Sequence, residues 1–520
     1  MDPQDKSRRR ALKALAGVPV LGLMGFEIFK KTKYDRTHDL RKKILNELDL
    51  GDIQSRVKQI TDASGGDLLR LGMVGYGVRG SQLAKALGFM DPETFDNENG
   101  AETYATQIQH GNLNVALTGI CDVFDLHAEK GLAVSQHDIH TRGEFAKKHP
   151  VKRYRHYHEM LADPAIDGII IATPDHHHAQ MTIDAIQAGK HVYCEKSLIR
   201  REDEINRVYE AVKNSDLVFQ LGHQIPQNAV FQQAKEIIKR GLLGKISHVE
   251  TTTNRNTSSG AWIRHLDGDG NPKPGDLNSI DWKQWLGSLP DVPFSIERYY
   301  GWARFFDYDT GLLGQLFSHE FDAVNQAINL GIPSSAAASG GQYFYKDFGE
   351  IPDVMNCVFE YHEKELTLTY SANLTSSRGR DRTIYGQEAS MNLGGSLAIT
   401  PDRNSKRFKK LLEDGVVTSS SPMFTITERG KSSTVDAVSS ATASYYSSRG
   451  LTSTVIDGQM WDPTHLHLKE WIECIRHGGE TSANIEKAYE ESVAIAMADI
   501  SYREQCRTEW DPVNRKILRI

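Results

Sequence analysis

Apolar and polar positions follow two different rhythms along the chain. Between residues 67 and 225, short apolar runs alternate with stretches of helical spacing, and the run Asp167–Pro174 is apolar almost throughout. A continuous apolar strand is typical of a parallel sheet that is covered on both faces. Strands that alternate with helices predict an α/β fold here, with a doubly wound parallel sheet of the Rossmann type over residues 67–225.

The second rhythm begins near residue 244, where the apolar runs lengthen and alternate with polar positions. Four of them are expected to be strands of a largely antiparallel, open sheet: Ile246–Asn256, Val354–Tyr361, Glu365–Asn373 and Thr383–Leu393. Three periodic segments predict helices: Leu312–Leu330, Thr464–His477 and Ile485–Arg507. Residues 226–510 therefore predict an α+β domain whose C-terminal helices could pack back on the first domain. Asn404–Leu451 is weakly patterned and is expected to be a loop excursion.

The first 30 residues have the layout of an export signal. Arg8, Arg9 and Arg10 precede a mostly apolar run from Ala14 to Phe29. A basic start before a short apolar segment, with twin arginines, predicts a Tat-like signal that exports folded protein. No clear cleavage motif follows, so the segment could remain as a membrane anchor; an amphipathic or disordered N-terminus is the alternative. Residues 31–66 are then a tether, and the protein is expected in the periplasm, either free or anchored facing it.

Charge and cysteine usage exclude some classes of protein. The net charge is −7, and nucleic-acid binding usually needs a basic face, so nucleic acid is not an expected partner. The five cysteines are scattered through 520 residues, which excludes a disulfide scaffold.

A glycine-rich motif follows the first predicted strand and opens a helix. The six residues form G-x-G-x-x-G: Gly75, Tyr76, Gly77, Val78, Arg79 and Gly80. In this context the glycines permit a tight turn, close approach of a pyrophosphate, and close packing of the helix on the strand. The helix N-terminus supplies free N–H groups for the phosphates. The motif predicts a dinucleotide site.

Asp122 ends the second predicted strand, where a carboxylate can accept hydrogen bonds from both ribose hydroxyls. It lies further from the glycines than the usual ~20 residues, and the polar insertion Asp91–Asn112 accounts for the difference. Because a carboxylate repels a 2′-phosphate, Asp122 favours NAD. Arg79 could still reach such a phosphate, so NADP stays open.

An ordered series of motifs joins the glycine loop. It comprises Ala172–His178 (ATPDHHH), Glu195-Lys196, Asp281-Trp282, Arg298-Tyr299 and Ser318–Asp322 (SHEFD). The series, from about Leu68 to Pro512, resembles the glucose–fructose oxidoreductase/inositol dehydrogenase/MocA (Gfo/Idh/MocA) family. The resemblance implies that Thr173, Pro174, His176 and His178 line the nicotinamide side of the cofactor, and that Lys196 touches both the nicotinamide ribose and the substrate hydroxyl. Glu195 and Gln224 are further candidates for binding the cofactor. The resemblance also implies a homo-oligomer.

This chain departs from the family's motifs at two places. The Glu-Lys-Pro segment is Glu195-Lys196-Ser197 here, which leaves the local turn and any cis peptide in it open. The D-x-x-x-H segment has Gln315 in place of the aspartate, four residues before His319. This substitution weakens any proposal of a proton relay formed by an aspartate and His319.

Hydride removal from a carbinol needs a base for the hydroxyl proton and a positive charge beside the oxygen. His319 is the predicted base, and Lys196, with a pKa lowered beside a cationic nicotinamide, is its predicted electrostatic partner. The remaining residues predicted to contact a carbohydrate are Asn254, Trp302, Arg304, Gln315 and Asp322. No metal is expected at His176–His178, because no carboxylate or cysteine completes a tetrahedral set.

These observations predict an oxidoreductase that transfers hydride between a sugar or polyol and tightly bound NAD. One alternative keeps the fold and uses NAD transiently to cleave glycosides by oxidation and elimination. Another is a non-enzymatic protein that binds sugar or nucleotide.

Overall fold

The computed structural model describes residues 44, 46, 66–91, 107–141, 143–256, 262, 271–346, 349–380, 382–427, 451, 453–456 and 458–520. The predicted export signal, nearly all of the predicted tether and most of the predicted insertion at Asp91–Asn112 lie outside these residues. None of the described helices is both long and apolar enough to cross a membrane.

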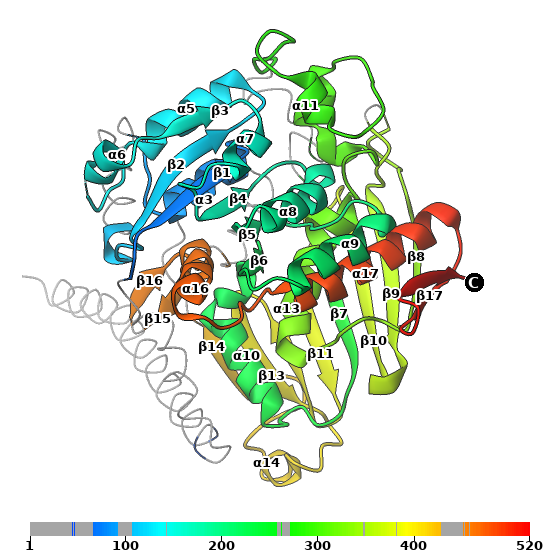
Figure 1. Ribbon diagram of the computed structural model, residues 1–520. Helices are drawn as coiled ribbons and strands as arrows, with labels where there is room; N and C mark the ends of the chain where they lie inside the picture. Colours follow the sequence, from blue (N-terminus) through cyan, green and yellow to red (C-terminus); the bar gives the residue numbers. More distant parts are fainter. Residues whose placement is uncertain are drawn as a thin grey trace, which may run out of the picture.

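The first domain is built on a six-stranded parallel sheet with the order β3-β2-β1-β4-β5-β6 (Figure 1). Its strands are β1 (Leu69–Val74), β2 (Val115–Cys121), β3 (Lys152–Tyr154), β4 (Gly168–Ile171), β5 (His191–Cys194) and β6 (Phe219–Leu221). The strands β1, β2, β4, β5 and β6 are almost wholly buried, which explains their unbroken apolar sequence. The doubly wound sheet predicted from the sequence is confirmed.

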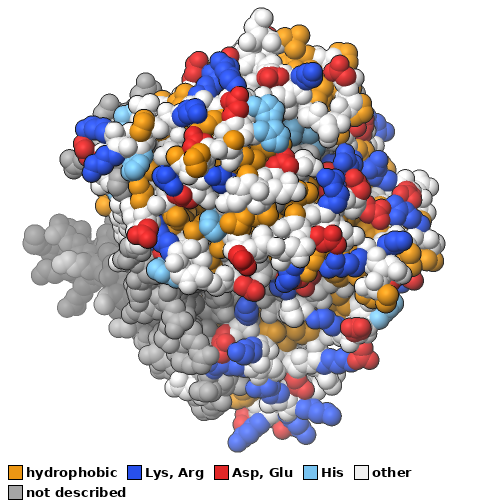
Figure 2. Space-filling view, in the orientation of Figure 1, with side chains coloured by type: hydrophobic (Ala, Val, Ile, Leu, Met, Phe, Trp, Pro, Cys, Tyr) orange, Lys and Arg blue, Asp and Glu red, His pale blue; other side chains and the backbone are white. Residues whose placement is uncertain are grey.

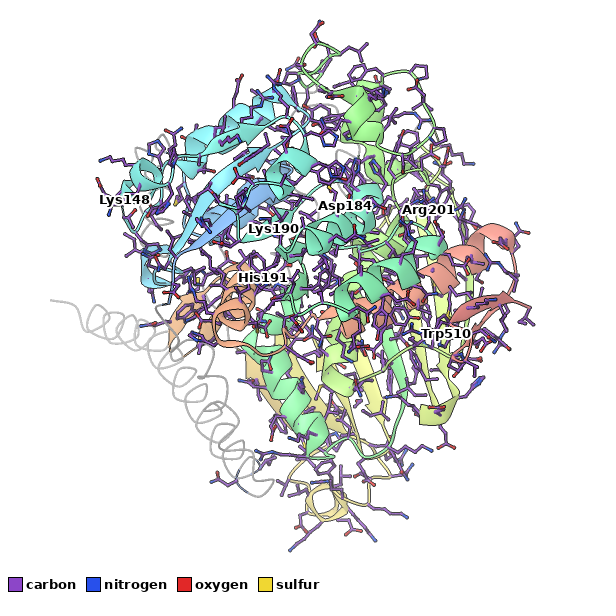
Figure 3. The ribbon with its side chains drawn as sticks, in the orientation of Figure 1. Lys148, Asp184, Lys190, His191, Arg201 and Trp510 are labelled. Carbon is purple, nitrogen blue, oxygen red and sulfur yellow. The ribbon has the colours of Figure 1, made fainter. Side chains whose placement is uncertain are left out.

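Helices connect these strands. They are α3 (Val78–Ala86), α5 (Asp125–Ser135), α6 (Glu144–Lys148), α7 (Tyr157–Leu161), α8 (His178–Gln187) and α9 (Glu202–Lys213). Lys190 and His191, which Figure 3 labels, lie at the N-terminal end of β5 and hydrogen-bond to the segments that precede β4 and β6. The Lys190 ammonium donates to the carbonyls of Asp163 and Ile166 at 2.8 and 2.7 Å, and His191 Nδ1 accepts from the Val218 N–H at 3.0 Å. Because the strands are parallel, all their carboxyl ends meet at the opposite edge.

The second domain contains a ten-stranded sheet of order β14-β13-β12-β11-β7-β10-β9-β8-β17-β18. Its strands are β7 (Ile246–Asn254), β8 (Ser335–Gly341), β9 (Val354–Tyr361), β10 (Leu366–Asn373), β11 (Arg382–Gly386), β12 (Ala389–Leu393), β13 (Ser396–Pro401), β14 (Phe424–Thr427), β17 (Thr508–Asp511) and β18 (Lys516–Arg519). Among the described strands of this sheet, β7 and β10 pair in parallel, and the other neighbouring strands pair antiparallel. The predicted largely antiparallel sheet is confirmed.

Two details of the sequence prediction are wrong. Thr383–Leu393 is a hairpin of β11 and β12 rather than one strand, because the chain turns at Gln387 and Glu388, between the end of β11 and the start of β12. The expected loop at Asn404–Leu451 contains helix α14 (Lys409–Glu413) and the edge strand β14, whose side chains Phe424 and Ile426 are buried.

Helices α10 (Ala229–Lys239), α13 (Ser318–Ile328) and α17 (Ile485–Glu504) lie along one side of the ten-stranded sheet, and α17 also packs against α9 of the first domain (Figure 1). Helix α16 (Pro463–His477) packs against α3 of the first domain. Trp471 of α16 belongs to the same buried cluster as Leu71, Ile170 and Tyr193 of the parallel sheet. On the face shown in Figure 2, basic and acidic side chains of the described residues are interspersed over both domains.

Candidate functional site

The glycine loop joins β1 to α3 at the carboxyl edge of the parallel sheet. Gly75 has a φ of +87°, and a Cβ there would lie 2.6 Å from the Ala172 carbonyl oxygen, so the turn requires glycine. A Cβ on Gly80 would lie 2.2 Å from the Gly75 oxygen, which explains the close packing of helix on strand. Gly77 has open space above it: a Cβ there would meet only His127, at 4.0 Å. A pyrophosphate fits this cradle, facing the N–H groups that open α3.

Asp122 connects the end of β2 to the glycine loop. One carboxylate oxygen accepts from the Tyr76 N–H at 2.6 Å, and the other accepts from the Phe124 N–H at 2.8 Å. His127 Nδ1 lies 3.7 Å from the carboxylate. Burial raises the pKa of Asp122 despite the attraction of His127 and the two N–H donors. Each oxygen keeps a second lone pair, so the residue can hold the loop and still accept from a ribose hydroxyl.

Arg79 extends from the glycine loop to the ends of β5 and β6. Its Nε donates to Glu195 Oε1 at 2.7 Å, and an Nη donates to Gln224 Oε1 at 3.2 Å. The Arg79 guanidinium is therefore held by the carboxylate of Glu195. With Arg79 bonded to Glu195 and Gln224, the carboxylate of Asp122 at the end of β2 favours NAD over NADP.

The segment Thr173–His178 forms the wall between the cofactor loop and the second domain. His176 Nε2 and His177 Nε2 lie 2.9 and 2.7 Å from the Trp285 carbonyl oxygen. The ring nitrogens of His178 face the carbonyl oxygens of Ser197 and Thr173 at 2.6 and 2.8 Å. The histidine run thus ties the carboxyl ends of β4 and β5 to the second domain. Among the described residues, no group of three or more His, Cys, Asp and Glu is placed to hold a metal ion.

Lys196 follows β5, and its turn contains a cis peptide between Lys196 and Ser197. The turn is thus cis although the family's proline is replaced by serine. The Lys196 ammonium donates to Gln315 Oε1 at 3.0 Å and to the Gln315 carbonyl at 3.5 Å. Gln315 Nε2 in turn lies 3.3 and 3.4 Å from the two carboxylate oxygens of Asp175. Gln315 therefore accepts hydrogen bonds from Lys196, and it has no charge to place beside His319 as an aspartate would.

Asp309 lies beside this group and is completely buried. A Cβ on Gly314 would lie 3.0 Å from Asp309 Oδ1 and 3.3 Å from Asp175 Oδ2, so both carboxyl groups face the same glycine. Burial raises the pKa of Asp309 to about 6, although Lys196 opposes the shift. Burial and the neighbouring Asp309 raise the pKa of Asp175 well above its usual value. Lys196 is therefore accompanied by two carboxyl groups that hold protons more tightly than usual.

His319 lies in the first turn of α13, directly after the π-helical turn η6 (Leu313–Phe317) that carries Gln315. Such turns are frequent at functional sites, because they redirect the side chains that follow. Burial, and then the charge of Lys196, hold the pKa of His319 well below its usual value. The imidazole is thus neutral at neutral pH and able to accept a proton.

The other predicted carbohydrate ligands lie at different distances from this centre. Asp322 is buried on α13, where it accepts from Gln326 at 2.9 Å. Asn254 donates to the Arg378 carbonyl at 2.8 Å, and buried Arg304 donates to the Tyr345 carbonyl at 2.8 Å. Trp302 is partly buried against the apolar clusters. The structure therefore groups Gln315 and Asp322 with His319, and engages Asn254 and Arg304 with backbone elsewhere.

Sequence reasoning gave no role to four buried polar residues of this region: Asp175, His223, Asp309 and Glu491. Asp175 and His223 follow the ends of β4 and β6, at the edge where ligands bind in open α/β sheets. That position in the sequence could have marked them as candidates. Asp309 and Glu491 are brought in by a loop and by helix α17, and nothing local in the sequence marks them.

Comparison with known proteins agrees with this geometry. Residues 69–223 match the model of the Gfo/Idh/MocA oxidoreductase family with an NAD-binding Rossmann fold. The first domain of the chain is thus similar to the NAD-binding domain of this family. The chain is 28% identical over 190 residues to levoglucosan dehydrogenase of Pseudarthrobacter phenanthrenivorans, covering 36% of this chain and 41% of that protein. It is 31% identical over 104 residues to myo-inositol 2-dehydrogenase of Thermotoga maritima, covering 20% of this chain and 31% of that protein. The chain thus spans less than half the length of these curated relatives.

Solved structures show a similar fold over more of the chain. A levoglucosan dehydrogenase in complex with NADH and L-sorbose superimposes with a TM-score of 0.54 at 16% identity, covering 87% of this chain and 99% of that one. The WlbA dehydrogenase of Bordetella pertussis, in complex with NADH and UDP-GlcNAcA, gives a TM-score of 0.53 at 15% identity, covering 86% and 99%. At such identities the likeness shows the fold.

Proposed function

We propose that the protein is an oxidoreductase that transfers hydride between a carbinol carbon of a sugar, polyol or related carbohydrate and tightly bound NAD. The observation that carries the proposal is that Lys196 and His319 lie close to Arg79 of the glycine loop. Arg79 of the loop bonds to Glu195, the neighbour of Lys196, and the charges of both Arg79 and Lys196 act on His319. The cofactor cradle and an acid–base pair thus belong to one site.

In the direction of oxidation, His319 takes the proton of the substrate hydroxyl. It can do so because its imidazole is neutral at neutral pH. Lys196 faces the same centre and stabilises the negative charge that develops on the oxygen, while Gln315 fixes the ammonium through a 3.0 Å hydrogen bond. Bound NAD supplies the acceptor for the hydride. Burial of these groups excludes water and strengthens each electrostatic interaction.

Two variants test these roles with levoglucosan and myo-inositol, the substrates named in the relatives, among a panel of sugars and polyols. His319→Ala removes the base and is expected to lower kcat by about 10²–10⁴-fold. Lys196→Met removes the charge while keeping the length of the side chain, and is expected to lower kcat similarly. Both should still bind NAD by fluorescence titration. Turnover of either variant close to that of the wild type would reject its assigned role.

The Asp175–Asp309 pair supports a second candidate, glycoside cleavage through transient oxidation. Elimination next to an oxidised carbon needs a base besides His319, and the two carboxyl groups beside Lys196 are available for it. This reaction restores NAD and consumes none. Release of free sugar from a nitrophenyl glycoside without added cofactor would favour it. Its absence, with net formation of NADH from free sugars, would favour the simple oxidoreductase.

The Tat-like N-terminus supports a further proposal, that the protein is exported with NAD already bound and works in or facing the periplasm. Free nicotinamide cofactor is expected to be scarce there, so a tightly held, recycled cofactor suits that location. Replacing Arg8 and Arg9 by lysine should retain the protein in the cytoplasm. Unchanged export of that variant would reject a Tat signal. The family resemblance likewise supports a homo-oligomer, which light scattering would test.

A further inference from the structure

A chain of buried polar side chains leads away from His319. His223 follows β6, His319 begins α13 and Glu491 lies on α17, three elements that lie close together in Figure 1. The Nδ1 atoms of His223 and His319 are 3.3 Å apart, and their rings are nearly perpendicular, at 85°. His223 Nε2 lies 2.8 Å from Glu491 Oε2. The three side chains are 1%, 4% and 2% exposed.

The order of atoms along this chain constrains where the protons lie. With Glu491 as a carboxylate, His223 Nε2 carries a proton toward it, so neutral His223 has its lone pair on Nδ1. His319 Nδ1 is then protonated and donates to His223 Nδ1, and the lone pair of His319 lies on Nε2. When His223 is protonated on both nitrogens, the shared proton belongs to His223 and the remaining proton of His319 lies on Nε2. With neutral His223, His319 can accept a proton on Nε2 and act as a base. With protonated His223, His319 carries a proton on Nε2 and can act as an acid.

The surrounding charges favour a positive charge on His223 over one on His319. Four cationic or ionisable bases face His319: Lys196, His223, Arg79 and Arg382. His223 faces Lys196, His319 and His467 as well, but the carboxylates of Glu491 and Asp322 lie against it. Burial lowers the pKa of His223, and the attraction of Glu491 and Asp322 outweighs burial, so that the pKa is raised. The pKa of His319 moves in the opposite direction.

We propose that His223 and Glu491 are positioning residues that form a proton relay with His319, holding its imidazole in the reactive tautomer and receiving the charge produced by the reaction. They take the part of the carboxylate that the sequence lacks at Gln315. This inference rests on the proposed function, since it assigns a partner to the proposed base.

The relay balances in protons and electrons. In oxidation the substrate O–H bond breaks and its proton forms a bond with His319 Nε2. The proton on His319 Nδ1 passes to His223 Nδ1, which leaves His319 neutral and His223 an imidazolium beside Glu491. The electron pair of the substrate C–H bond leaves as hydride to the nicotinamide, so the carbinol is oxidised by two electrons and NAD is reduced. Reduction runs the same steps in reverse.

The pH dependence has a definite sign. Oxidation requires neutral His223 as the proton acceptor, so its rate should fall on the acid side through the raised pKa of His223. Glu491→Gln removes the carboxylate charge but keeps the shape, which lowers that pKa. The acid limb should therefore move to lower pH by about one unit or more, while the plateau kcat falls about tenfold or more because the imidazolium is less stabilised. KM should change by less than about threefold.

The matched control is Glu490→Gln, the same change one residue earlier on α17. Glu490 contacts Lys487 at 2.9 Å and Asn325 at 2.7 Å, away from the histidines. Its pH profile should match that of the wild type. Glu491→Asp restores the charge and should return the acid limb toward the wild-type position, which a merely structural role for Glu491 would not produce.

A measurement without substrate keeps the test independent of enzymatic activity. In the full-length protein carrying histidine labelled with a nitrogen isotope, the His223 signals, assigned with His223→Asn, should titrate at higher pH than those of His319. Glu491→Gln should lower the titration midpoint of His223 by about one unit or more, and Glu490→Gln should not. An unchanged midpoint in Glu491→Gln overturns the relay.

The two proposals fail in different ways. If the wild type oxidises a carbohydrate and loses activity with His319→Ala, but Glu491→Gln keeps the wild-type pH profile and histidine titration, the relay is wrong and the proposed function stands. If NAD does not bind, or no carbohydrate of the panel is oxidised, the proposed function is wrong even where the histidine titration follows the expected order. Full activity of His319→Ala would reject His319 as the base, and the relay with it.

Discussion

At the residue scale, this site places several ionisable groups where burial opposes their charge. Asp309 is fully buried beside Lys196 and has its pKa raised to about 6. Asp322 is also raised to about 6, mainly by burial. Burying such groups lowers the free energy of unfolding in return for a preorganised site, so replacing them with neutral residues should raise it.

Asp309→Asn is expected to stabilise the protein above pH 6 and to lower its activity. A folded-state pKa above the unfolded value means that the folded state binds more protons between about pH 4 and 6, so its stability falls as pH rises through that window. With Asn the fall is absent, which predicts a gain of about 2–3 kcal/mol at pH 7. Chemical denaturation at pH 4.5 and 7 measures it. Equal stability of the two proteins at both values would contradict the raised pKa.

At the element scale, the parallel sheet and its glycine loop could be predicted because their signals are local. Six consecutive residues, Gly75–Gly80, contain the turn, the cradle and the helix start. The relay could not be predicted, because His223 and His319 are 96 positions apart and meet only when β6 and α13 pack. The hairpin at residues 382–393 was missed because alternation continues on both sides of Gly386.

The end of β2 offers a prediction about cofactor choice. Asp122→Ser removes the carboxylate that accepts from Tyr76 and Phe124 and that disfavours a 2′-phosphate. NAD should bind about tenfold more weakly, equivalent to about 1.4 kcal/mol, and the preference for NAD over NADP should shrink by at least as much. Titration with both nucleotides measures the two constants. Glu144→Gln, an exposed change on α6, is the control; undiminished NAD preference in Asp122→Ser would reject the role of Asp122.

At the scale of the whole molecule, the last part of the chain packs against the first domain. Trp471 of α16 is fully buried, and its indole N–H faces the Val218 carbonyl at 3.4 Å. A Cβ on Gly168 of β4 would lie 3.1 Å from the Trp471 ring, so strand and helix are in close contact. Helix α17 likewise packs on both α9 of the first domain and β8 of the second. The site groups on α13 and α17 are thereby held against the parallel sheet.

Trp471→Ala is expected to destabilise the protein by about 3–5 kcal/mol, as for other large aromatic residues removed from a core. Because α16 and α17 join the two domains, both should unfold in one transition at a lower temperature, with loss of NAD binding at that same transition. Differential scanning calorimetry with and without NAD measures this. Two separated transitions, with NAD stabilising only the first domain, would contradict the coupling.

The most direct test of the account is a single-turnover measurement on the full-length protein loaded with NAD. Levoglucosan, myo-inositol and a panel of related carbohydrates are added, and the absorbance of the reduced nicotinamide is followed. The account predicts that at least one carbohydrate produces reduced nicotinamide at the level of the bound cofactor, and that Lys196→Met slows its appearance by about 10²–10⁴-fold. Failure of the protein to bind NAD on titration, or undiminished reduction in Lys196→Met, would contradict it.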